Sequence, residues 1–585
     1  MNILFEECEL SEFECYKKFG SVTLKWLYQN NMFHNRFKKS DLDISLIYKY
    51  IQYGEDINSD NIIFDRVNNL KSTGYNHPND IYLYNSREKI KKGMITNEKS
   101  IFYIGPKYNT KIEDGAIPEG IKKLFFRNSE IDYAYEPTYD YPMDEGTLPN
   151  SLEDLNFGNS PFNCILLEGI FKNRLLRLVL SKHFNQTILP NVLPESLLYL
   201  DLGMNNSKAL QESVLPSKLE FLKIGFRYNT ELKRNILPNS LKELVIYNDY
   251  MVFEEGSLPD SLEILFMLRN HTNRGITRGI LPQGLKILII RTFKGIIEEG
   301  ALPDSLKLFY IDNWDTNEIF HLQSGIIPSS VKLLSLSYVG MFNNIVLTEN
   351  SIPHSVIKLQ LGLMKINYEN NILIQNGYIP NQVKYLYCSS SHNVLLYEQG
   401  SIPDTIEYID TGYYSLDRFF EMLPENLIGL RLGYLSLYND TIQLPIGLKY
   451  LVIKSRGNRF KKLPPNLEQL IMENEKIDYN ILDNLHTNIK YIQWKEEVSN
   501  PNSMNKELNI WMNGKIYHRI EKYSKIINKF KEADFFNIYN IDKKLIKKEY
   551  LKELLFYKKK PENIMKYIQE GNSIEDSLSY CGYSI

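Results

Sequence analysis

Apolar residues recur at a fixed spacing through most of the chain. The stretch "LPESLLYLDLG" at 193–203 is followed twenty-two positions later by "LPSKLEFLKIG" at 215–225. Counting the proline as position 0, the shared pattern is Leu/Ile-Pro-x-Ser-Leu-x-x-Leu-x-Leu. Copies of this pattern lie at Pro118, Pro149, Pro194, Pro216, Pro238, Pro259, Pro282, Pro303, Pro328, Pro353, Pro380, Pro403, Pro424, Pro445 and Pro464. Most gaps between successive prolines are 19 to 27 residues, which identifies a repeat array.

Two further copies lack the proline. "FKNRLLRLVL" at 171–180 has Lys172 in its place, and "LHTNIKYIQW" at 485–494 has His486. With these copies the array amounts to about seventeen units of about 22 residues each.

The spacing inside each unit predicts one short β-strand. Positions +6 and +8 are apolar in nearly every copy, as at Leu200 and Leu202 and again at Leu222 and Ile224. An apolar residue at every second position indicates a strand with one buried face. One such strand per unit, always in the same direction, gives a long parallel sheet, roughly 75–80 Å in length at a strand spacing of about 4.8 Å.

A unit of this size is not stable by itself. Each buried Leu-sized side chain contributes roughly 1.5–3 kcal/mol, whereas ordering the backbone costs roughly 1–2 kcal/mol per residue. Neighbouring units must therefore share one core, which predicts a solenoid. The proline suits a turn before the strand. The remaining residues of each unit are too few for a long helix on the return.

Several return segments carry an aromatic residue followed by asparagine and, two or three positions later, an aliphatic residue. They are "FNCIL" at 162–166, "FNQTI" at 184–188, "YNTEL" at 228–232, "FNNIV" at 342–346 and "YNDTI" at 438–442. Together with the Leu-Pro pattern, these segments resemble the FNIP repeat, a relative of the leucine-rich repeat (LRR) found in social amoebae and in giant viruses that infect amoebae. The resemblance covers roughly residues 100–495.

The two ends of the chain lack the repeat. Residues 1–98 contain apolar residues at helical spacing over 10–30 and 40–54, and residues 496–585 do so over 518–536 and 543–571. The sequence therefore predicts a β-rich α+β protein: an LRR-like solenoid with one long parallel sheet over 99–495, an N-terminal helical cap or adaptor-like segment over 1–98, and a C-terminal helical segment over 496–585. Such caps would cover the ends of the shared core.

Positions +5 and +7 of each strand are expected to point away from the core and to offer a binding surface. They are polar early in the array, at Lys123, Asp154, Asn156, Arg177 and Asp201, and become apolar and then rich in tyrosine. Apolar patches and tyrosines mark interaction sites. The predicted partner-binding residues are Phe221, Val245, Ile264, Phe266, Ile287, Ile289, Leu308, Tyr310, Leu333, Tyr385, Tyr387, Tyr408 and Tyr450. The alternative is that loops of the chain cover these side chains, or that both faces of the sheet are buried.

Composition narrows the class of protein. The 585 residues are 43% hydrophobic and 24% charged with a net charge of −3, which excludes general disorder and gives no case for a nucleic-acid or membrane partner. The start of the chain has no basic region typical of a signal peptide, and the longest strongly apolar run, 285–290, is too short to span a bilayer. The five scattered cysteines favour a reducing compartment, so we expect a cytoplasmic protein, in the host cytoplasm if it is viral.

Candidate catalytic chemistry is not found in the sequence. The nine histidines and five cysteines form no pair at metal-binding spacing. Phosphate loops, nucleophile elbows and kinase motifs are likewise missing from the sequence. The lysines of the C-terminal segment, such as Lys547 and Lys548, alternate with glutamates and are typical of a solvated helix face. We therefore predict no catalytic, cofactor-binding or metal-binding residue, no cofactor and no enzyme activity.

The function that the sequence favours is a protein–protein interaction scaffold that binds a protein partner on the sheet. Because many FNIP proteins carry an N-terminal F-box, the resemblance implies an alternative: a substrate receptor of an SCF-type ubiquitin ligase, attached through a Skp1-type adaptor. An F-box opens with Leu-Pro ahead of a three-helix unit, and residues 1–60 contain no Leu-Pro. A third alternative is a structural or virion-associated component.

Overall fold

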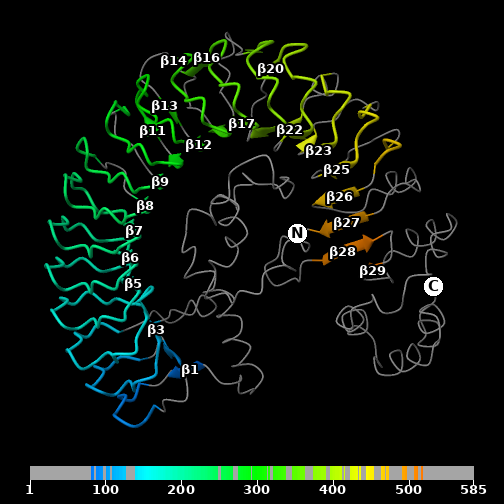
Figure 1. The fold of residues 1–585 in the computed structure, drawn as a ribbon. Helices are drawn as coiled ribbons and strands as arrows, with labels where there is room; N and C mark the ends of the chain where they lie inside the picture. Colours follow the sequence, from blue (N-terminus) through cyan, green and yellow to red (C-terminus); the bar gives the residue numbers. More distant parts are fainter. Residues whose placement is uncertain are drawn as a thin grey trace, which may run out of the picture. The chain divides into compact units, whose positions relative to one another are not determined.

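The computed structural model describes most of residues 81–517, apart from gaps of which the longest are 127–138, 363–372 and 474–490. The described residues fall into two compact units that divide between Val356 and Ile357. All regular secondary structure among them is β-strand (Figure 1). The described residues contain no helix that could cross a membrane.

The first unit is a parallel β-solenoid. Each turn contributes one strand to a sheet in which every strand pairs with the strand of the next turn. These strands are β1 (Ile81–Tyr84), β2 (Ile101–Ile104), β3 (Lys123–Phe126), β4 (Asp154–Asn156), β5 (Arg177–Val179), β6 (Tyr199–Asp201), β7 (Phe221–Ile224), β8 (Glu243–Ile246), β9 (Ile264–Met267), β10 (Ile287–Ile290), β12 (Leu308–Asp312) and β15 (Leu333–Ser337). The register pairs equivalent repeat positions, as with Leu200, Leu222 and Leu244.

The return segments of this unit run on one side of the sheet (Figure 1). Some of them form short parallel pairs of their own, β11 (Phe293–Lys294) with β13 (Trp314–Asp315) and β14 (Phe320–Leu322) with β16 (Ile345–Leu347). The core of the unit lies between these segments and the sheet.

The second unit repeats this architecture. Its parallel strands are β17 (Lys358–Gly362), β19 (Tyr385–Ser389), β21 (Tyr408–Asp410), β23 (Gly429–Leu432), β25 (Tyr450–Ile453), β26 (Gln469–Glu473) and β27 (Tyr491–Glu496). Return strands pair as β18 (Leu373–Ile374) with β20 (Leu396–Tyr397) and β22 (Tyr414–Ser415) with β24 (Tyr434–Leu435). Two antiparallel strands, β28 (Lys506–Trp511) and β29 (Lys515–Tyr517), follow β27.

The predicted strand pattern is confirmed by burial. Leu219, Leu222 and Ile224, at positions +3, +6 and +8 of one repeat, are each 0% exposed. Phenylalanines extend this column into the return segments: the ring centroids of Phe157 and Phe162 lie 4.1 Å apart, and those of Phe162 and Phe184 lie 6.5 Å apart. Each repeat therefore completes the core of its neighbours, as the size of the unit requires.

The serine of the Leu-Pro-x-Ser-Leu pattern joins successive turns. Ser196 Oγ donates a hydrogen bond to the backbone oxygen of Leu175, 2.7 Å away, in the preceding repeat. Ser240 Oγ does the same to Leu219, also at 2.7 Å. The proline carbonyl closes the turn, since Leu197 N donates to Pro194 O at 3.0 Å. Proline, serine and leucine of the pattern thus supply the turn, the inter-repeat bond and the core residue.

The asparagines of the Phe-Asn pairs form a second ladder in the return segments. Asn185 N donates to Asn163 Oδ1 at 2.7 Å, and Ser207 N donates to Asn185 Oδ1 at 2.9 Å. The adjacent Phe162 and Phe184 are fully buried. Asn163 and Asn185 thus each accept a backbone hydrogen bond from the following turn, which gives a physical reason for the asparagine that follows the buried ring.

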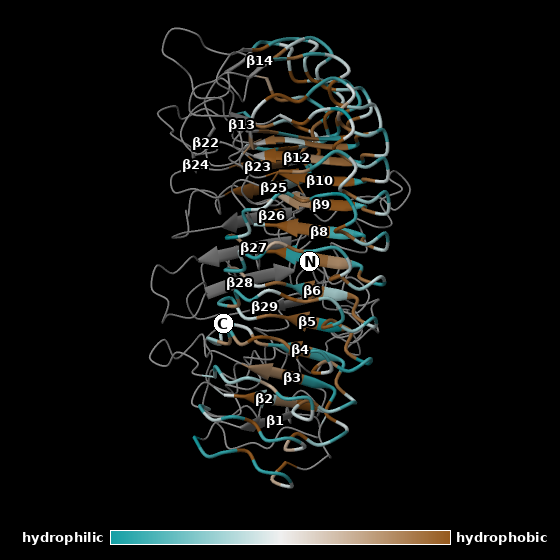
Figure 2. Cartoon of the chain, turned by 90° about the vertical axis from the view of Figure 1, so that its left-hand side faces the viewer, coloured by the Kyte–Doolittle hydropathy of each residue, from teal (hydrophilic) through white to brown (hydrophobic). Residues whose placement is uncertain are grey.

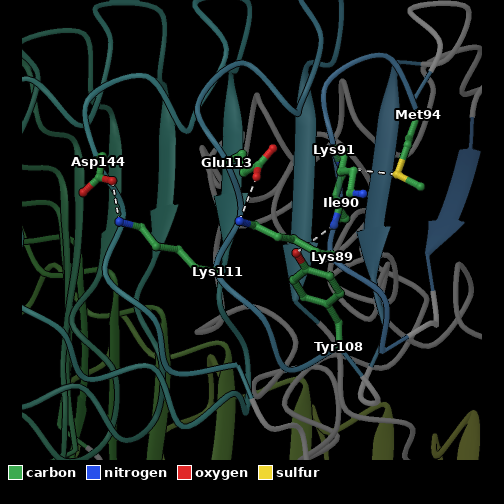
Figure 3. Close-up of polar contacts among 8 residues, drawn as sticks. All are labelled: Lys89, Ile90, Lys91, Met94, Tyr108, Lys111, Glu113 and Asp144. Carbon is green, nitrogen blue, oxygen red and sulfur yellow. Dashed lines mark hydrogen bonds and ion pairs between the residues drawn. The ribbon is translucent and has the colours of Figure 1, made fainter.

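Ion pairs also connect the first turns (Figure 3). Lys89 Nζ lies 2.7 Å from Glu113 Oε1, and Lys111 Nζ lies 2.5 Å from Asp144 Oδ2. The hydrogen bond and the positive charge of Lys89 lower the pKa of Glu113. Because all four side chains are more than 40% exposed, these pairs contribute little to stability.

The predicted α+β class with flanking helices is wrong. Strand β1 lies in the segment 1–98 and pairs with β2, while β28 and β29 lie in the segment 496–585 and pair in sequence after β27. A strand added to an open sheet edge satisfies the backbone groups of that edge, which a packed helix does not. The segments that the apolar spacing predicts to be helical lie outside the described residues; they are 10–30, 40–54, 518–536 and 543–571. The domain boundaries at 98 and 495 stay a prediction.

We predict that Ser240→Ala lowers the free energy of unfolding by about 1 kcal/mol, the usual contribution of one hydrogen bond. Urea unfolding would measure the change. The neighbouring repeat supplies a matched control, because Lys218 stands at the equivalent position and Lys218→Ala removes no such bond. Equal effects of the two substitutions would contradict a role for the serine ladder.

A second prediction concerns acid stability. Glu119 Oε1 accepts a hydrogen bond from Asn150 N at 2.9 Å, and Oε2 accepts one from Ser151 N at 3.0 Å. Burial raises the pKa of Glu119, but these hydrogen bonds outweigh it and hold the pKa below the ordinary 4.5. The ionised Glu119 therefore contributes its full stabilisation of the fold above pH 4.5. This contribution is lost as the pH falls through the lower pKa that Glu119 has in the folded state.

We expect Glu119→Gln to be less stable than the native chain at neutral pH, with a difference that shrinks on acidification below pH 4.5. Urea midpoints measured over a pH series would show it. Glu168→Gln, at an exposed glutamate of the same unit, serves as the control. A difference that is independent of pH would contradict the assignment.

Candidate interaction surface on the sheet

The face of the sheet opposite the return segments is built from positions +5 and +7. On β7, Phe221 and Lys223 alternate with the core residues Leu222 and Ile224. Because the register joins equivalent positions, side chains of this outward face stand in rows along the sheet. Their chemistry changes along the first unit, from hydrophilic at β4 to hydrophobic at β8, β9 and β10 (Figure 2).

Opposite charges on neighbouring strands neutralise each other on β4 to β7. Arg177 Nη1 lies 2.9 Å from Asp154 Oδ1, and Lys223 Nζ lies 2.7 Å from Asp201 Oδ2. All four side chains are at most 16% exposed, so the pairing offsets the cost of removing these charges from water. Sequence reasoning identified the polar residues of this region but not their pairing across strands.

Aromatic rings continue this row. The Arg177 guanidinium lies 5.0 Å from the centroid of the Tyr199 ring, and that ring stacks on Phe221 with centroids 4.0 Å apart. Phe221, the first of the predicted partner-binding residues, is only 5% exposed. This end of the outward face is therefore packed within the chain.

The predicted apolar binding residues of the first unit are brought together, but they are buried. We call this set the apolar face; it consists of Val245, Ile264, Phe266, Ile287, Ile289, Leu308, Tyr310 and Leu333 on strands β8 to β15. Tyr310 is 3% exposed and the others are 0% exposed. The expectation of solvent exposure fails at these positions, and their assignment to partner binding stays a prediction.

Ser335 completes the apolar face at the outward position of β15 next to Tyr310. It is 0% exposed, and its Oγ has no hydrogen-bond partner among the described residues. Sequence reasoning missed it, although it lies at the same +7 position as the residues that were named.

The tyrosines of the second unit form a stacked row that remains partly accessible. We call it the tyrosine ridge. The ring centroids of Tyr385 and Tyr408 lie 4.9 Å apart, and those of Tyr408 and Tyr450 lie 6.5 Å apart. All three residues are intermediate in burial, and the structure brings them next to one another. Their binding role stays a prediction.

Gly429 makes the ridge continuous. It stands on β23 in register between Tyr408 and Tyr450. A Cβ atom at Gly429 would lie 2.4 Å from Cδ1 of Tyr408, closer than real contacts allow. The Tyr408 ring thus lies over the glycine backbone and reaches toward the ring two strands away. In the sequence, the glycine at position +5 is the signal that could have revealed this contact between rings.

Charged residues border the ridge. Arg431 Nη1 lies 3.2 Å from Asp410 Oδ2, while the Lys358 Nζ lies 4.8 Å from the centroid of the Tyr387 ring. Burial lowers the pKa of Lys358 well below its usual value, although the charge of Asp410 opposes this. Burial, with the negative charge of Asp410, raises the pKa of Tyr387. Tyr387, also predicted to bind, is 9% exposed.

The arrangement suits noncovalent recognition. The ridge offers ring edges and hydroxyl groups beside an ion pair, which are groups favoured at protein interfaces. Among the described residues, no group of three or more histidine, cysteine, aspartate or glutamate side chains is placed to hold a metal ion.

Substitution inside the apolar face tests its burial. Phe266→Asp combined with Ile289→Asp would place two carboxylates where the native side chains have no exposed surface. Because burying a charge without a partner is costly, we expect a loss of several kcal/mol in the free energy of unfolding. Thermal melting compared with the apolar changes Phe266→Leu and Ile289→Val, which remove volume but add no charge, would measure it. A variant with two aspartates that melts like the native chain would show that the face is open in solution.

Comparisons with known proteins agree with the repeat pattern. The FNIP Repeat family matches residues 162–205, 184–227, 228–268 and 273–311. A solved structure, the crystal structure of the giant-virus protein CroV588, described as a novel circular LRR protein, matches with 26% sequence identity and a TM-score of 0.52. The match covers 69% of this chain and 57% of that chain, so this chain spans less than two thirds of that protein. No curated protein matches the chain significantly.

The Phe-Asn pairs at 162–163 and 184–185 lie inside the matched copies. Their buried rings and asparagine ladder supply the physical basis of the match. Residues 162–311 therefore match the FNIP repeat within an LRR-like solenoid, in agreement with the resemblance seen in the sequence.

Proposed function

We propose that the chain is a non-enzymatic scaffold that binds a protein partner through the outward face of its sheet. A repeat solenoid of the LRR-like type is typical of protein-interaction scaffolds. The observation that carries the proposal is the tyrosine ridge, which combines ordered rings with partial exposure on the outward face.

The ridge is suited to binding because its rings are already fixed. Tyr385 and Tyr408 stack at an interplanar angle of 7°, so little side-chain freedom remains to be lost when a partner binds. Tyrosine and arginine are enriched among residues that dominate binding energy, and Arg431 is held beside the ridge by Asp410. A partner with polar and aromatic groups at its surface fits this chemistry best.

The other predicted roles stay predictions. Residues 1–60, which would carry a divergent F-box and contact a Skp1-type adaptor, lie outside the described residues. Cytoplasmic location and a role in a virion are likewise expectations from the sequence. The described residues favour neither alternative over a scaffold.

Removing or displacing one ring tests the proposal. We expect Tyr408→Ala to abolish capture of a protein partner from an amoebal lysate by the full-length chain, because it removes the central ring of the ridge. Gly429→Ala should weaken capture as well, because the added methyl group displaces the same ring. Quantitative mass spectrometry of the captured proteins is the measurement.

Tyr450→Phe is the matched control, because it keeps the ring and removes only the hydroxyl group. Melting temperatures of all variants would establish that they fold. A set of captured proteins that is unchanged by Tyr408→Ala in a folded variant would reject the ridge as the binding surface.

A further inference from the structure

Three large aliphatic side chains are exposed together on the return side of the first unit. Ile165, Leu167 and Leu189 are 60%, 58% and 53% exposed. They belong to the return segments that follow β4 and β5, on the side of the sheet away from its outward face (Figure 1). We call these three residues the aliphatic patch.

Hydrogen bonds between the two return segments place the members of the patch next to one another. Asn185 N donates to Asn163 Oδ1 at 2.7 Å, which holds the segments in register. Leu167 and Leu189 each follow their asparagine by four residues, so they stand side by side. Ile165 precedes Leu167 by two residues and therefore lies on the same side of an extended segment. The patch is thus contiguous, unlike single exposed apolar residues, which are common on any protein.

The two leucines break a pattern that the other repeats keep. Position −5, counted back from position 0, opens a turn in which its backbone oxygen accepts a hydrogen bond from the N–H of position −2. Ile170 N donates to Leu167 O in this way at 3.4 Å, and Leu189 O accepts the equivalent bond. In every other described turn with this bond the residue at position −5 is polar or charged, as at Asp144 and Gln211 in the turns on either side.

A leucine at this position adds nothing to the shared core. More than half of the surface of Leu167 and of Leu189 is in water, although apolar surface stabilises a fold only when it is buried. Departures from a local pattern without a gain for the fold are typical of functional sites. The patch therefore points to a contact with another molecule.

Glutamates border the aliphatic patch at position −4. Glu145, Glu168 and Glu212 are all exposed. Lys172 Nζ lies 3.3 Å from Glu145 Oε1 and offsets its charge, and the exposed Lys208 stands in the return segment that also carries Glu212. With three glutamates to two lysines, the border is acidic. A partner that covers the patch needs basic side chains beside its apolar ones.

We propose that the aliphatic patch binds an amphipathic, basic helix of another protein. Residues three or four apart on a helix have Cβ atoms about 5–6 Å apart, and the equivalent rings of Phe162 and Phe184 in the two return segments have centroids 6.5 Å apart. Leucines of a helix laid across these segments can therefore meet Leu167 and Leu189 while its lysines or arginines face the glutamates. The proposal is independent of the function proposed above, because it concerns a different surface.

A second copy of the chain is a less compatible occupant. Two copies joined through the patch would bring two acidic borders together, and like charges oppose such a contact. Self-association is one of the outcomes that the experiment below distinguishes.

Two synthetic helical peptides test the proposal with the full-length chain. One has leucines at the spacing i, i+3, i+4, i+7 and lysine elsewhere, and the other has glutamate in place of lysine. Fluorescence anisotropy of the labelled peptides would measure binding. We expect the native chain to bind the lysine peptide and not the glutamate peptide.

The variant Leu167→Gln with Leu189→Gln should weaken binding of the lysine peptide by about tenfold or more, because it removes the apolar surface of the patch. Glutamine suits this turn, as Gln211 shows at the equivalent position. Ile296→Gln is the matched control, because Ile296 is 51% exposed in the same unit but lies outside the patch. Its affinity for the peptide should equal that of the native chain.

A charge variant tests the acidic border. Glu168→Gln should weaken binding of the lysine peptide, and more so at low than at high salt. Glu349→Gln is its control, because Glu349 is exposed at position −4 of a later repeat.

Three results would overturn the proposal: no binding of the lysine peptide, equal binding of the glutamate peptide, or binding that the two glutamines leave unchanged in a folded variant. Melting curves would establish that each variant folds. Sedimentation velocity covers the remaining occupant. A native dimer that the two glutamines dissociate would assign the patch to a second copy and would equally overturn the proposal.

Discussion

A single repeat is too small to bury its own leucines, and the rest of the described structure depends on that constraint. Leu219, Leu222 and Ile224 are fully buried only because the repeats on either side complete their surroundings. The serine and asparagine ladders then fix each turn against the next, through bonds such as Ser240 to Leu219 and Asn185 to Asn163. The residues that recur in the sequence are therefore the residues that form the contacts between successive turns.

This division of roles explains how much the sequence could predict. In the repeats that the structure describes, positions +3, +6 and +8 face the core and are apolar apart from Thr411, so the sheet could be predicted strand by strand. The Phe-Asn pairs could also be identified from the sequence, because both residues have a repeated role. The ring of Phe184 lies in the core, and the backbone N–H of Asn185 donates a hydrogen bond to Asn163 in the preceding turn. The prediction of helical flanks failed where the structure describes the flanks, at β1, β28 and β29. Apolar spacing in short segments does not reveal that an open sheet edge is available for pairing.

The outward face was predictable in position but not in accessibility. Strand alternation says that Phe266 and Ile289 point away from the core; it says nothing about what lies above them. The stacking of the tyrosine rings cannot be predicted from the hydrophobic pattern either. Glycine has a low propensity for β-strands, so Gly429 would not be expected to matter here. Its lack of a side chain nevertheless allows the ring of Tyr408 to approach that of Tyr450. Both features arise from contacts between residues distant in sequence.

The two outward surfaces consequently have different relations to a partner. The tyrosine ridge is partly exposed, so an external protein meets rings that are already in place. The apolar face has almost no exposed surface. The ridge is therefore the part of the outward face best placed for a first encounter with another protein.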